Sequence, residues 1–349
     1  MGTAKNMRHL RVPSRETSAW RDKLSSNGWL SVGYGIHNLG EFRGIPLNES
    51  APDFFDGLDI VEMEAITSGP NHWTERLESD LFDSFKEFWP MSHDQIGDVI
   101  TVKIPKEISQ FSQEIATAML NQHSSARIVC ADNGVKGEFR VRDLEVLKTR
   151  SDTSTRTRVR EHGNEFLTDP GLVYYSPRLA TERLETVEVA KQLSEKLGRK
   201  ISVCDPYAGA GPAVVPLTKI PEFVENIFAS DLNPNAAELL GLNLPDCVTK
   251  CADARVLSEK LGECCDLLLV NLPHETVDHL PHLIGLLNRG HEVVIRGWAI
   301  LESDSIPIAE TEIRNHLSEC QIISLEITPK KSYSSSISYV SIEAHLIRD

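Results

Sequence analysis

The residues best suited to chemistry lie in the glycine loop 205–212, which reads DPYAGAGP. The loop follows an apolar, strand-like stretch, which is where an open α/β sheet binds its ligand. Gly209 and Gly211 would let the backbone approach a ligand closely, and Asp205 can accept a hydrogen bond from an ammonium group or a water. A lone GxG also occurs in plain tight turns. Because Val214 follows Gly211 three positions later, the loop does not complete GxGxxG, which disfavours a dinucleotide fold.

Two further acids follow the loop in an order that suits a nucleoside. Asp231 stands in SDLNP at the end of the next apolar stretch, where an acid can accept both ribose hydroxyls. Asp253 stands in ADAR before the following strand and is placed for an adenine amino group. Each acid alone would more often be an ordinary surface residue. Together with Asp205, in order and at successive strand ends, they predict an adenosyl cofactor, S-adenosylmethionine.

The fourth strand end carries Asn271-Leu272-Pro273. Methyltransferases that act on exocyclic amines of DNA and RNA hold Asn/Asp-Pro-Pro-Tyr/Phe at this place, and the aromatic ring stacks on a flipped base. Leu272 and His274 stand where a proline and the aromatic would be. The sequence therefore disfavours methylation of an exocyclic amine.

These residues need a doubly wound α/β sheet to bring them together. From residue 173 onward apolar strands alternate with amphipathic helices, which predicts a parallel sheet, and the last two strands lack a helix between them and should form an antiparallel hairpin. That ending is typical of class I methyltransferases, whose sheet is Rossmann-like. The expected helices span 178–197, 234–243, 277–287 and 308–320, with one more after the glycine loop, and the expected strands span 201–204, 226–230, 267–270, 291–296, 322–328 and 336–346.

Two smaller α/β (α+β) domains are expected before this sheet. The first contains a strand at 9–12 and a helix up to Leu24, and 48–70 would be a connector or an edge of that unit. The second contains helices at 73–88 and 108–121 and strands within 97–105, 126–131 and 138–147. We expect domains at 1–65, 66–165 and 166–349.

The combined motifs resemble a known family. VYYSPRLATER (173–183), DPYAGAGP, SDLNP, ADAR and NLP are similar to the archaeal and eukaryotic tRNA (guanine-N1)-methyltransferases that act at position 37. The resemblance continues upstream through GDVITVKIP (97–105) and GEFRVRDLE (137–145) and persists more weakly in the first 60 residues, where the family has a small domain that senses the outer corner of tRNA. SPRLATER together with NLP is far more specific than the glycine loop.

The resemblance implies a mechanism. Guanine N1 carries a proton, so attack on a sulfonium methyl group needs a general base, and Glu182 of SPRLATER would be that base. Arg142 would donate to the charge that develops on O6, and Arg178 is a second candidate for that role or for a phosphate contact. Asn271 and Pro273 would shape the base pocket. The plainer alternatives are an acid favoured at a helix N-terminus for Glu182 and an exposed strand arginine for Arg142.

The motifs and the same resemblance imply a set of binding residues. The cofactor-binding residues are Tyr174, Arg178, Asp205, Ala208, Gly209, Gly211, Asp231, Leu232, Asn233, Asp253, Ala254 and Asn271. The expected RNA-binding residues are Lys136, Arg140, Lys148, Arg150, Arg156 and Arg158. Tyr174, Tyr175 and Trp298 are candidates to stack on a splayed base, although each type is more often a core residue.

The net charge of −15 speaks against general nucleic-acid binding, but one stretch is basic. Residues 136–160 hold eight Lys and Arg against four acids, which is either a solvated loop or a local tRNA-binding face with steep salt dependence. The seven cysteines form no CxxC pair, so we expect reduced thiols and no metal. Without an apolar leader or a long apolar run, a cytoplasmic protein is expected, and the resemblance implies a monomer.

Three alternatives stay open. A related wyosine-pathway enzyme transfers the aminocarboxypropyl group of the same cofactor to modified guanine 37, but it lacks NLP. Some archaeal relatives also methylate imidazo-guanine, and no residue separates these activities. The third alternative is a non-catalytic RNA-binding protein with a vestigial cofactor fold, which retention of Asp205, Asp231, Glu182 and NLP disfavours.

Overall fold

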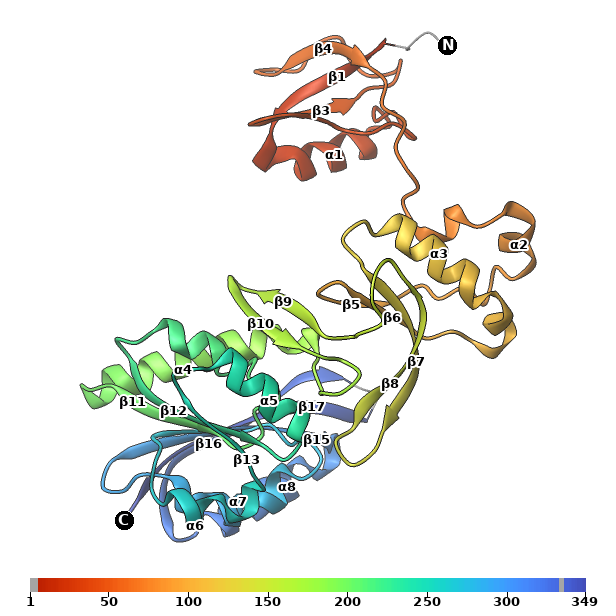
Figure 1. Cartoon of the computed structure of the whole chain (residues 1–349). Helices are drawn as coiled ribbons and strands as arrows, with labels where there is room; N and C mark the ends of the chain where they lie inside the picture. Colours follow the sequence, from red (N-terminus) through yellow and green to blue (C-terminus); the bar gives the residue numbers. More distant parts are fainter. Residues whose placement is uncertain (1–5, 333–335) are drawn as a thin grey trace. The chain divides into compact units, whose positions relative to one another are not determined.

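The chain forms two compact units (Figure 1). The computed structural model describes residues 6–332 and 336–349. One unit comprises Met1–Glu87 with Thr117–Gln122, and the other comprises Phe88–Ala116 with His123–Asp349. The division into domains at 1–65, 66–165 and 166–349 stays a prediction.

The first unit is built on a four-stranded antiparallel sheet in the order β2-β3-β1-β4. Its strands are β1 (Asn6–Pro13), β2 (His37–Leu39), β3 (Phe42–Pro46) and β4 (Asp59–Glu64). Helix α1 (Thr17–Ser26) contributes Leu24 to a core with Leu10, Val12 and Ile45, all of them fully buried. The predicted strand at 9–12, the helix that ends near residue 24 and the edge within 48–70 are confirmed.

The helix predicted at 73–88 is wrong. A capping box closes a single 3-10 turn, η2 (Trp73–Arg76), because the His72 ring accepts from Thr74 N and the Glu75 carboxylate accepts from His72 N. Leu77 then adopts extended backbone, so only the short α2 (Ser79–Ser84) follows.

The second unit begins with a four-stranded sheet in the order β5-β6-β7-β8. Its strands are β5 (Asp94–Ile96), β6 (Val99–Val102), β7 (Ile128–Lys136) and β8 (Val141–Thr149). η3 (Lys106–Phe111) and α3 (Ser112–Gln122) connect the parallel pair β6 and β7. The hairpin of β9 (Thr157–Glu161) and β10 (Asn164–Thr168) was not predicted, because its alternating arginines read as a solvated loop.

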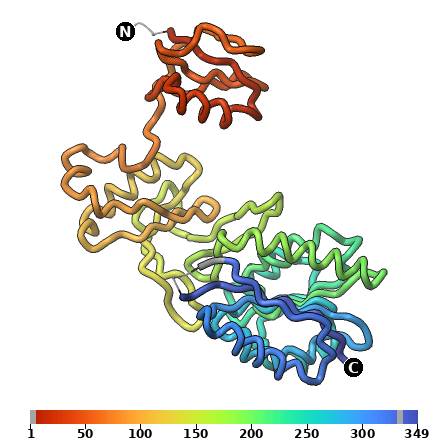
Figure 2. Tube along the Cα trace, turned by 180° about the vertical axis from the view of Figure 1, so that it is seen from behind, coloured from red at the N-terminus to blue at the C-terminus, as the bar shows by residue number. Residues whose placement is uncertain are grey.

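A seven-stranded sheet follows in the order β13-β12-β11-β14-β15-β17-β16, in which β17 runs antiparallel to β15 and β16 and the other pairs are parallel (Figure 1). The hairpin of the last two strands closes one edge, as predicted, and is coloured dark blue in Figure 2. The strands are β11 (Ile201–Asp205), β12 (Val224–Asp231), β13 (Val248–Cys251), β14 (Leu267–Val270), β15 (Glu292–Glu302), β16 (Cys320–Ser332) and β17 (Ile337–Arg348).

Helices cover both faces of this sheet (Figure 1). One face packs against α4 (Ala180–Leu197) and α5 (Pro234–Asn243), and the other packs against α6 (Leu257–Leu261), α7 (Thr276–Leu283) and α8 (Ile306–His316). Side chains alternate along a strand, so neighbouring residues pack on opposite faces of the sheet. Val203 packs on the face that α4 and α5 cover, and Cys204 packs on the face that α6, α7 and α8 cover.

The helix expected after the glycine loop is only the 3-10 helix η5 (Val215–Lys219). Pro216 lies in its first turn and Pro221 follows its end, and such proline density prevents a longer α-helix. Strand β13 was missed because it is short, polar and at the sheet edge. Within the described ranges, no helix is long and apolar enough to cross a membrane.

Candidate active site

The glycine loop adopts a conformation that only glycine accommodates easily. Gly209 has φ 57° and Gly211 has φ 90°, both in the left-handed region. A Cβ atom on Gly211 would lie 2.9 Å from Cδ1 of Leu240 on α5. Gly209 N donates to Oδ2 of Asp231 at 2.8 Å, and Asn233 N donates to Oδ1 of the same carboxylate at 2.9 Å. The loop and the end of β12 are therefore locked together.

Asp205 and Asp231 place a buried and a partly buried carboxylate at neighbouring strand ends. Asp205 is 1% exposed and accepts a hydrogen bond from Tyr207 N at 3.1 Å. Burial raises the pKa of Asp205 to about 7, and the nearby Asp231 charge acts in the same direction. Burial also raises the pKa of Asp231. Burial therefore destabilises the ionised form of both carboxyl groups. A bound ligand with a positive charge would offset this penalty, so such a ligand would be favoured here.

Asp253 has a different environment. Its carboxylate caps η6 (Ala254–Val256) by accepting from Arg255 N at 2.9 Å, and it also accepts from the Arg255 guanidinium at 2.7 Å. These hydrogen bonds from Arg255 lower the pKa of Asp253 to about 2. Of the other predicted cofactor contacts, Leu232 and Tyr174 keep exposed side chains, whereas Asn233 is buried.

The NLP segment lies beside β15. Val270, the last residue of β14, pairs with Gly297, so Asn271 and Trp298 each directly follow this pair on their own segment. The Pro273 carbonyl accepts from Ile300 N at 2.8 Å, which fixes the segment against β15. Among the residues that the structure describes, Oδ1 of Asn271 finds no hydrogen-bond partner, although it is buried. A buried amide oxygen without a partner is costly and suggests that a ligand supplies the donor.

Glu182 is buried in the first turn of α4 and is 7% exposed. Its Oε2 accepts from Nε1 of Trp298 at 2.9 Å and lies 3.4 Å from Nη2 of Arg296. Its Oε1 lies 3.4 Å from Nζ of Lys330. Glu182 is thus more than a solvated acid at a helix start: Trp298 ties it to the strand that carries the NLP contact.

Arg142 and Arg178, predicted from segments far apart in the sequence, share one carboxylate. Asp94 on β5 accepts from Nη2 of Arg142 at 2.8 Å and from Nη2 of Arg178 at 3.1 Å. Arg142 also donates to Asp132 at 2.8 Å and to Thr101 at 3.1 Å. Burial opposes ionisation of Asp94, yet the hydrogen bonds from both arginines leave its pKa below the ordinary value.

Sequence reasoning missed Asp94. Its only sequence signal was that it is an acid just ahead of the GDVITVKIP motif. In the structure Asp94 lies on the three-residue strand β5, and the pairing of β5 with β6 brings it to Arg142. Arg178 lies in η4 (Pro177–Leu179), immediately before the helix that carries Glu182. Asp94 therefore connects the middle sheet to the segment that leads into the candidate base.

Three of the six predicted RNA-binding residues, Lys136, Arg156 and Arg158, form ion pairs with acids in the described ranges. Arg158 donates to Glu165 at 2.6 Å, and Arg156 donates to Glu238 at 2.9 Å. Lys136 pairs with Asp143, whereas Arg140 is exposed at the turn between β7 and β8. Arg150 donates to the Ser124 carbonyl at 2.9 Å, and Lys148 is exposed.

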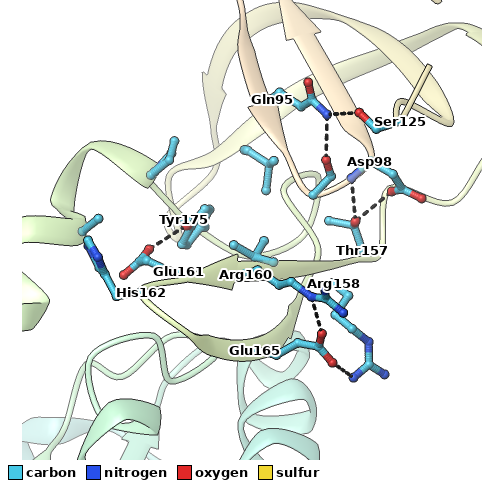
Figure 3. Close-up of a pocket in the computed structure, with 15 residues that line it drawn as sticks. Gln95, Asp98, Ser125, Thr157, Arg158, Arg160, Glu161, His162, Glu165 and Tyr175 are labelled. Carbon is cyan, nitrogen blue, oxygen red and sulfur yellow. Dashed lines mark hydrogen bonds and ion pairs between the residues drawn. The ribbon is translucent and has the colours of Figure 1, made fainter. Parts of the chain in front are cut away.

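A groove runs along the β9–β10 hairpin (Figure 3). It measures about 810 Å³ and is lined by Arg158, Arg160 and His162 on one side and by Gln95 and Ser125 on the other. The arginines lie over Glu165, which accepts from both of them, so their charge is partly compensated. Apolar side chains, among them Ile96, Val159 and Pro177, also line the groove.

Two of the three predicted stacking residues are in the core. Tyr175 is 5% exposed and donates its hydroxyl to Glu161, and Trp298 is 3% exposed and holds Glu182. The prediction that these two residues stack on a base is therefore wrong, because packing already covers their rings. Tyr174 is half exposed and remains a candidate.

Three cysteines form a cluster that their sequence spacing did not suggest. The sulfur atoms of Cys204, Cys264 and Cys265 lie within 4.8 Å of one another. Cys204 and Cys265 are fully buried among apolar residues, and burial raises the pKa of the Cys265 thiol. Hydrogen bonds with Cys204 and Cys265 instead lower the pKa of the Cys264 thiol to about 4, so the cluster combines one thiol that ionises easily with two that resist ionisation.

Comparison with known proteins agrees with this geometry. Residues 157–330 match the TRM5/TYW2 methyltransferase domain, and residues 73–150 match the TYW2 N-terminal domain. The tRNA (guanine(37)-N(1))-methyltransferase Trm5b of Pyrococcus abyssi is 30% identical over 297 residues, which cover 83% of each chain.

Solved structures show the same fold. The complex of aTrm5 with tRNALeu has a TM-score of 0.66 at 23% identity and covers 97% of this chain and 99% of that chain. TYW2 of Pyrococcus horikoshii bound to MeSAdo has a TM-score of 0.63 at 18% identity and covers 79% of this chain and 97% of its own. With its glycine loop, strand-end acids and seven-stranded sheet, the chain belongs to the TRM5/TYW2 methyltransferase family.

Proposed function

We propose that this protein transfers the methyl group of S-adenosylmethionine to N1 of guanine 37 in tRNA, with Glu182 as the general base. The observation that carries the proposal is the buried Glu182 carboxylate, which accepts a hydrogen bond from Trp298 of β15, the strand that pairs with β14 just before the NLP segment. Within the part of the chain that the structure describes, Oδ1 of Asn271 in that segment has no hydrogen-bond partner. The relative from Pyrococcus abyssi is named for this reaction.

The residues present fit the cofactor. Gly209 and Gly211 keep the loop free of side chains, and the two strand-end carboxylates, Asp205 and Asp231, would attract the ammonium and sulfonium charges and accept the ribose hydroxyls. Asp253 caps its own helix turn and would meet the adenine edge. When bound, S-adenosylmethionine supplies an electrophilic methyl group.

The chain's own residues would manage the proton and the charge of the base. Guanine N1 must lose its proton as it attacks, and Glu182 would accept that proton. The negative charge then shifts toward O6, where the Arg142 guanidinium would donate a hydrogen bond. Asp94 and Asp132 hold that guanidinium from opposite ends, which limits its freedom before substrate arrives. Oδ1 of Asn271 would accept from a base N–H, and Pro273 would bound the pocket.

The proposed partner is the anticodon loop of tRNA. Arg140, Arg158 and the groove along β9–β10 would contact the phosphate backbone, and the paired acids would keep the protein from binding other polyanions tightly. Arg178 would either support Arg142 or contact a phosphate. We further propose a monomeric, cytoplasmic enzyme.

One competing activity has specific support, since the family domain is shared with TYW2 and the match at 73–150 carries that name. Transfer of the aminocarboxypropyl group would use the same cofactor site. The NLP segment favours methyl transfer. The N-terminal unit does so as well, since the Trm5 structure covers 97% of this chain whereas that of TYW2 covers 79%. Methylation of imidazo-guanine as a further substrate stays open.

The test is transfer of label from S-adenosylmethionine to tRNA transcripts that carry guanine or adenine at position 37. Cofactor labelled in the methyl group and cofactor labelled in the aminocarboxypropyl carbons are used in parallel. We expect methyl label in the guanine transcript only. Equal labelling of both transcripts would overturn the position-37 assignment, transfer of the aminocarboxypropyl label would establish the competing activity, and cofactor binding without any transfer would support a non-catalytic RNA-binding protein.

A further inference from the structure

The carboxylate of Glu182 is held asymmetrically. Its Oε2 receives the 2.9 Å hydrogen bond from Nε1 of Trp298, whereas its Oε1 lies 3.4 Å from Nζ of Lys330. Lys330 is itself bound more closely to Glu185, at 2.6 Å. One oxygen is therefore fixed by a short bond, and the other is more available to a substrate.

Arg296 does not take the place of the indole. Its guanidinium makes its close contacts with two other acids, Glu343 at 2.6 Å and Glu185 at 2.8 Å, and approaches Glu182 only to 3.4 Å. A close ion pair would weaken a base by stabilising its charged form. A neutral indole donor fixes the orientation of the carboxylate with a smaller loss of basicity.

Trp298 is well placed to act as a rigid donor. Its backbone carbonyl accepts from Oγ1 of Thr276 at 2.7 Å, and on the other side it pairs with Ser341 of β17. The indole is 3% exposed, and the Arg296 guanidinium lies 5.5 Å from the ring centroid. Gly297, which precedes Trp298, pairs with Val270, which precedes Asn271, so the residue that holds the base follows the same strand pair as the NLP segment.

We propose that Trp298 is a positioning residue for catalysis: its indole N–H holds Oε2 of Glu182 so that Oε1 accepts the proton of guanine N1. This inference rests on the proposed role of Glu182. Nothing in the sequence pointed to it, because Trp298 lies more than a hundred residues from Glu182 and was a candidate to stack on a base.

The decisive variant is Trp298→Phe, which removes the donor and keeps an aromatic ring. Loss of one such hydrogen bond should lower kcat about tenfold, while KM for tRNA and for S-adenosylmethionine changes less than about twofold. The acidic limb of the kcat profile should move to higher pH, because the carboxylate loses a donor that stabilises its charge. Trp29→Phe, in the other compact unit, is the matched control and should leave kcat unchanged.

A double-mutant cycle separates a role through Glu182 from a loss of packing. In the Glu182→Gln background, Trp298→Phe should have almost no further effect on the rate. An undiminished tenfold loss in that background, or an unmoved acidic limb, would overturn the proposal. If Glu182→Gln alone keeps the wild-type rate, the base assignment itself fails. If Glu182→Gln is slow but Trp298→Phe is normal, only the positioning role fails.

A second measurement does not depend on how Trp298→Phe folds. The protein has five tryptophans, and each contributes one indole N–H signal to the NMR spectrum of 15N-labelled protein. Glu182→Gln should shift the Trp298 indole signal strongly and leave the other four close to their wild-type positions. No selective shift would contradict the hydrogen bond on which the proposal stands.

Discussion

Asp205 should limit the stability of the ligand-free enzyme, and its replacement by asparagine should raise it. The side chain is 1% exposed, and burial raises its pKa from the ordinary 3.8 to about 7. Each pKa unit corresponds to about 1.4 kcal/mol, so ionised Asp205 costs the fold about 4 kcal/mol. In Asp205→Asn the amide oxygen can still accept from Tyr207 N, but the side chain carries no charge.

The gain in stability should grow with pH. The folded carboxyl binds its proton more tightly than the unfolded one, so the stability associated with it is complete below the unfolded pKa of 3.8 and is lost as pH rises through about 7. Asp205→Asn should therefore be more stable than wild type by about 2 kcal/mol near pH 5.5 and by about 4 kcal/mol above pH 8.

Urea unfolding of both proteins without cofactor, at the two pH values, measures these differences. Calorimetric titration with S-adenosylmethionine is the companion assay. The variant should bind the cofactor more weakly, and wild-type affinity should fall as pH decreases below about 7, because the protonated carboxyl no longer attracts a cation. A variant that is less stable than wild type at pH 8, or a difference independent of pH, would refute this reasoning.

Three further changes test the site. Gly211→Ala should destabilise the protein by about 1–3 kcal/mol in thermal unfolding, because its Cβ meets Leu240 and the residue has a positive φ, and an unchanged Tm would contradict the loop geometry. Asp94→Asn should lower turnover on tRNA with cofactor affinity unchanged, since Arg142 and Arg178 lose their shared anchor; equal losses of both would indicate a folding defect. Arg140→Gln should reduce the salt slope of tRNA binding by about one, and Arg158→Gln should do so less, because Glu165 already compensates Arg158; the reverse order would argue against a phosphate contact at the β7–β8 turn.

The methyltransferase sheet was largely predictable because its signals are local. Apolar strands and amphipathic helices repeat along the chain, and the ends of helix α5 and of strand β14 match the predicted bounds. Clear boundary signals explain this: Pro234 starts α5, and four consecutive buried residues form β14. The expected helix after the glycine loop failed where prolines outweighed an apolar pattern.

The cofactor side of the site was predictable for a related reason. Asp205 and Asp231 each end a strand, and the carboxyl ends of parallel strands meet at one edge of a sheet. The partners of Glu182 and Arg142 were not predictable, because they depend on pairings over long sequence separations. Trp298 reaches Glu182 only after β15 enters the sheet, and Asp94 reaches Arg142 only across the middle sheet.

The most direct test of the central claim is the rate of methyl transfer by Glu182→Gln to guanine 37 in a single-turnover reaction. General-base catalysis contributes about a hundredfold or more, so the variant should be at least that much slower, with S-adenosylmethionine bound as tightly as by wild type. A rate within a few-fold of wild type, at equal cofactor saturation, would show that another group removes the N1 proton.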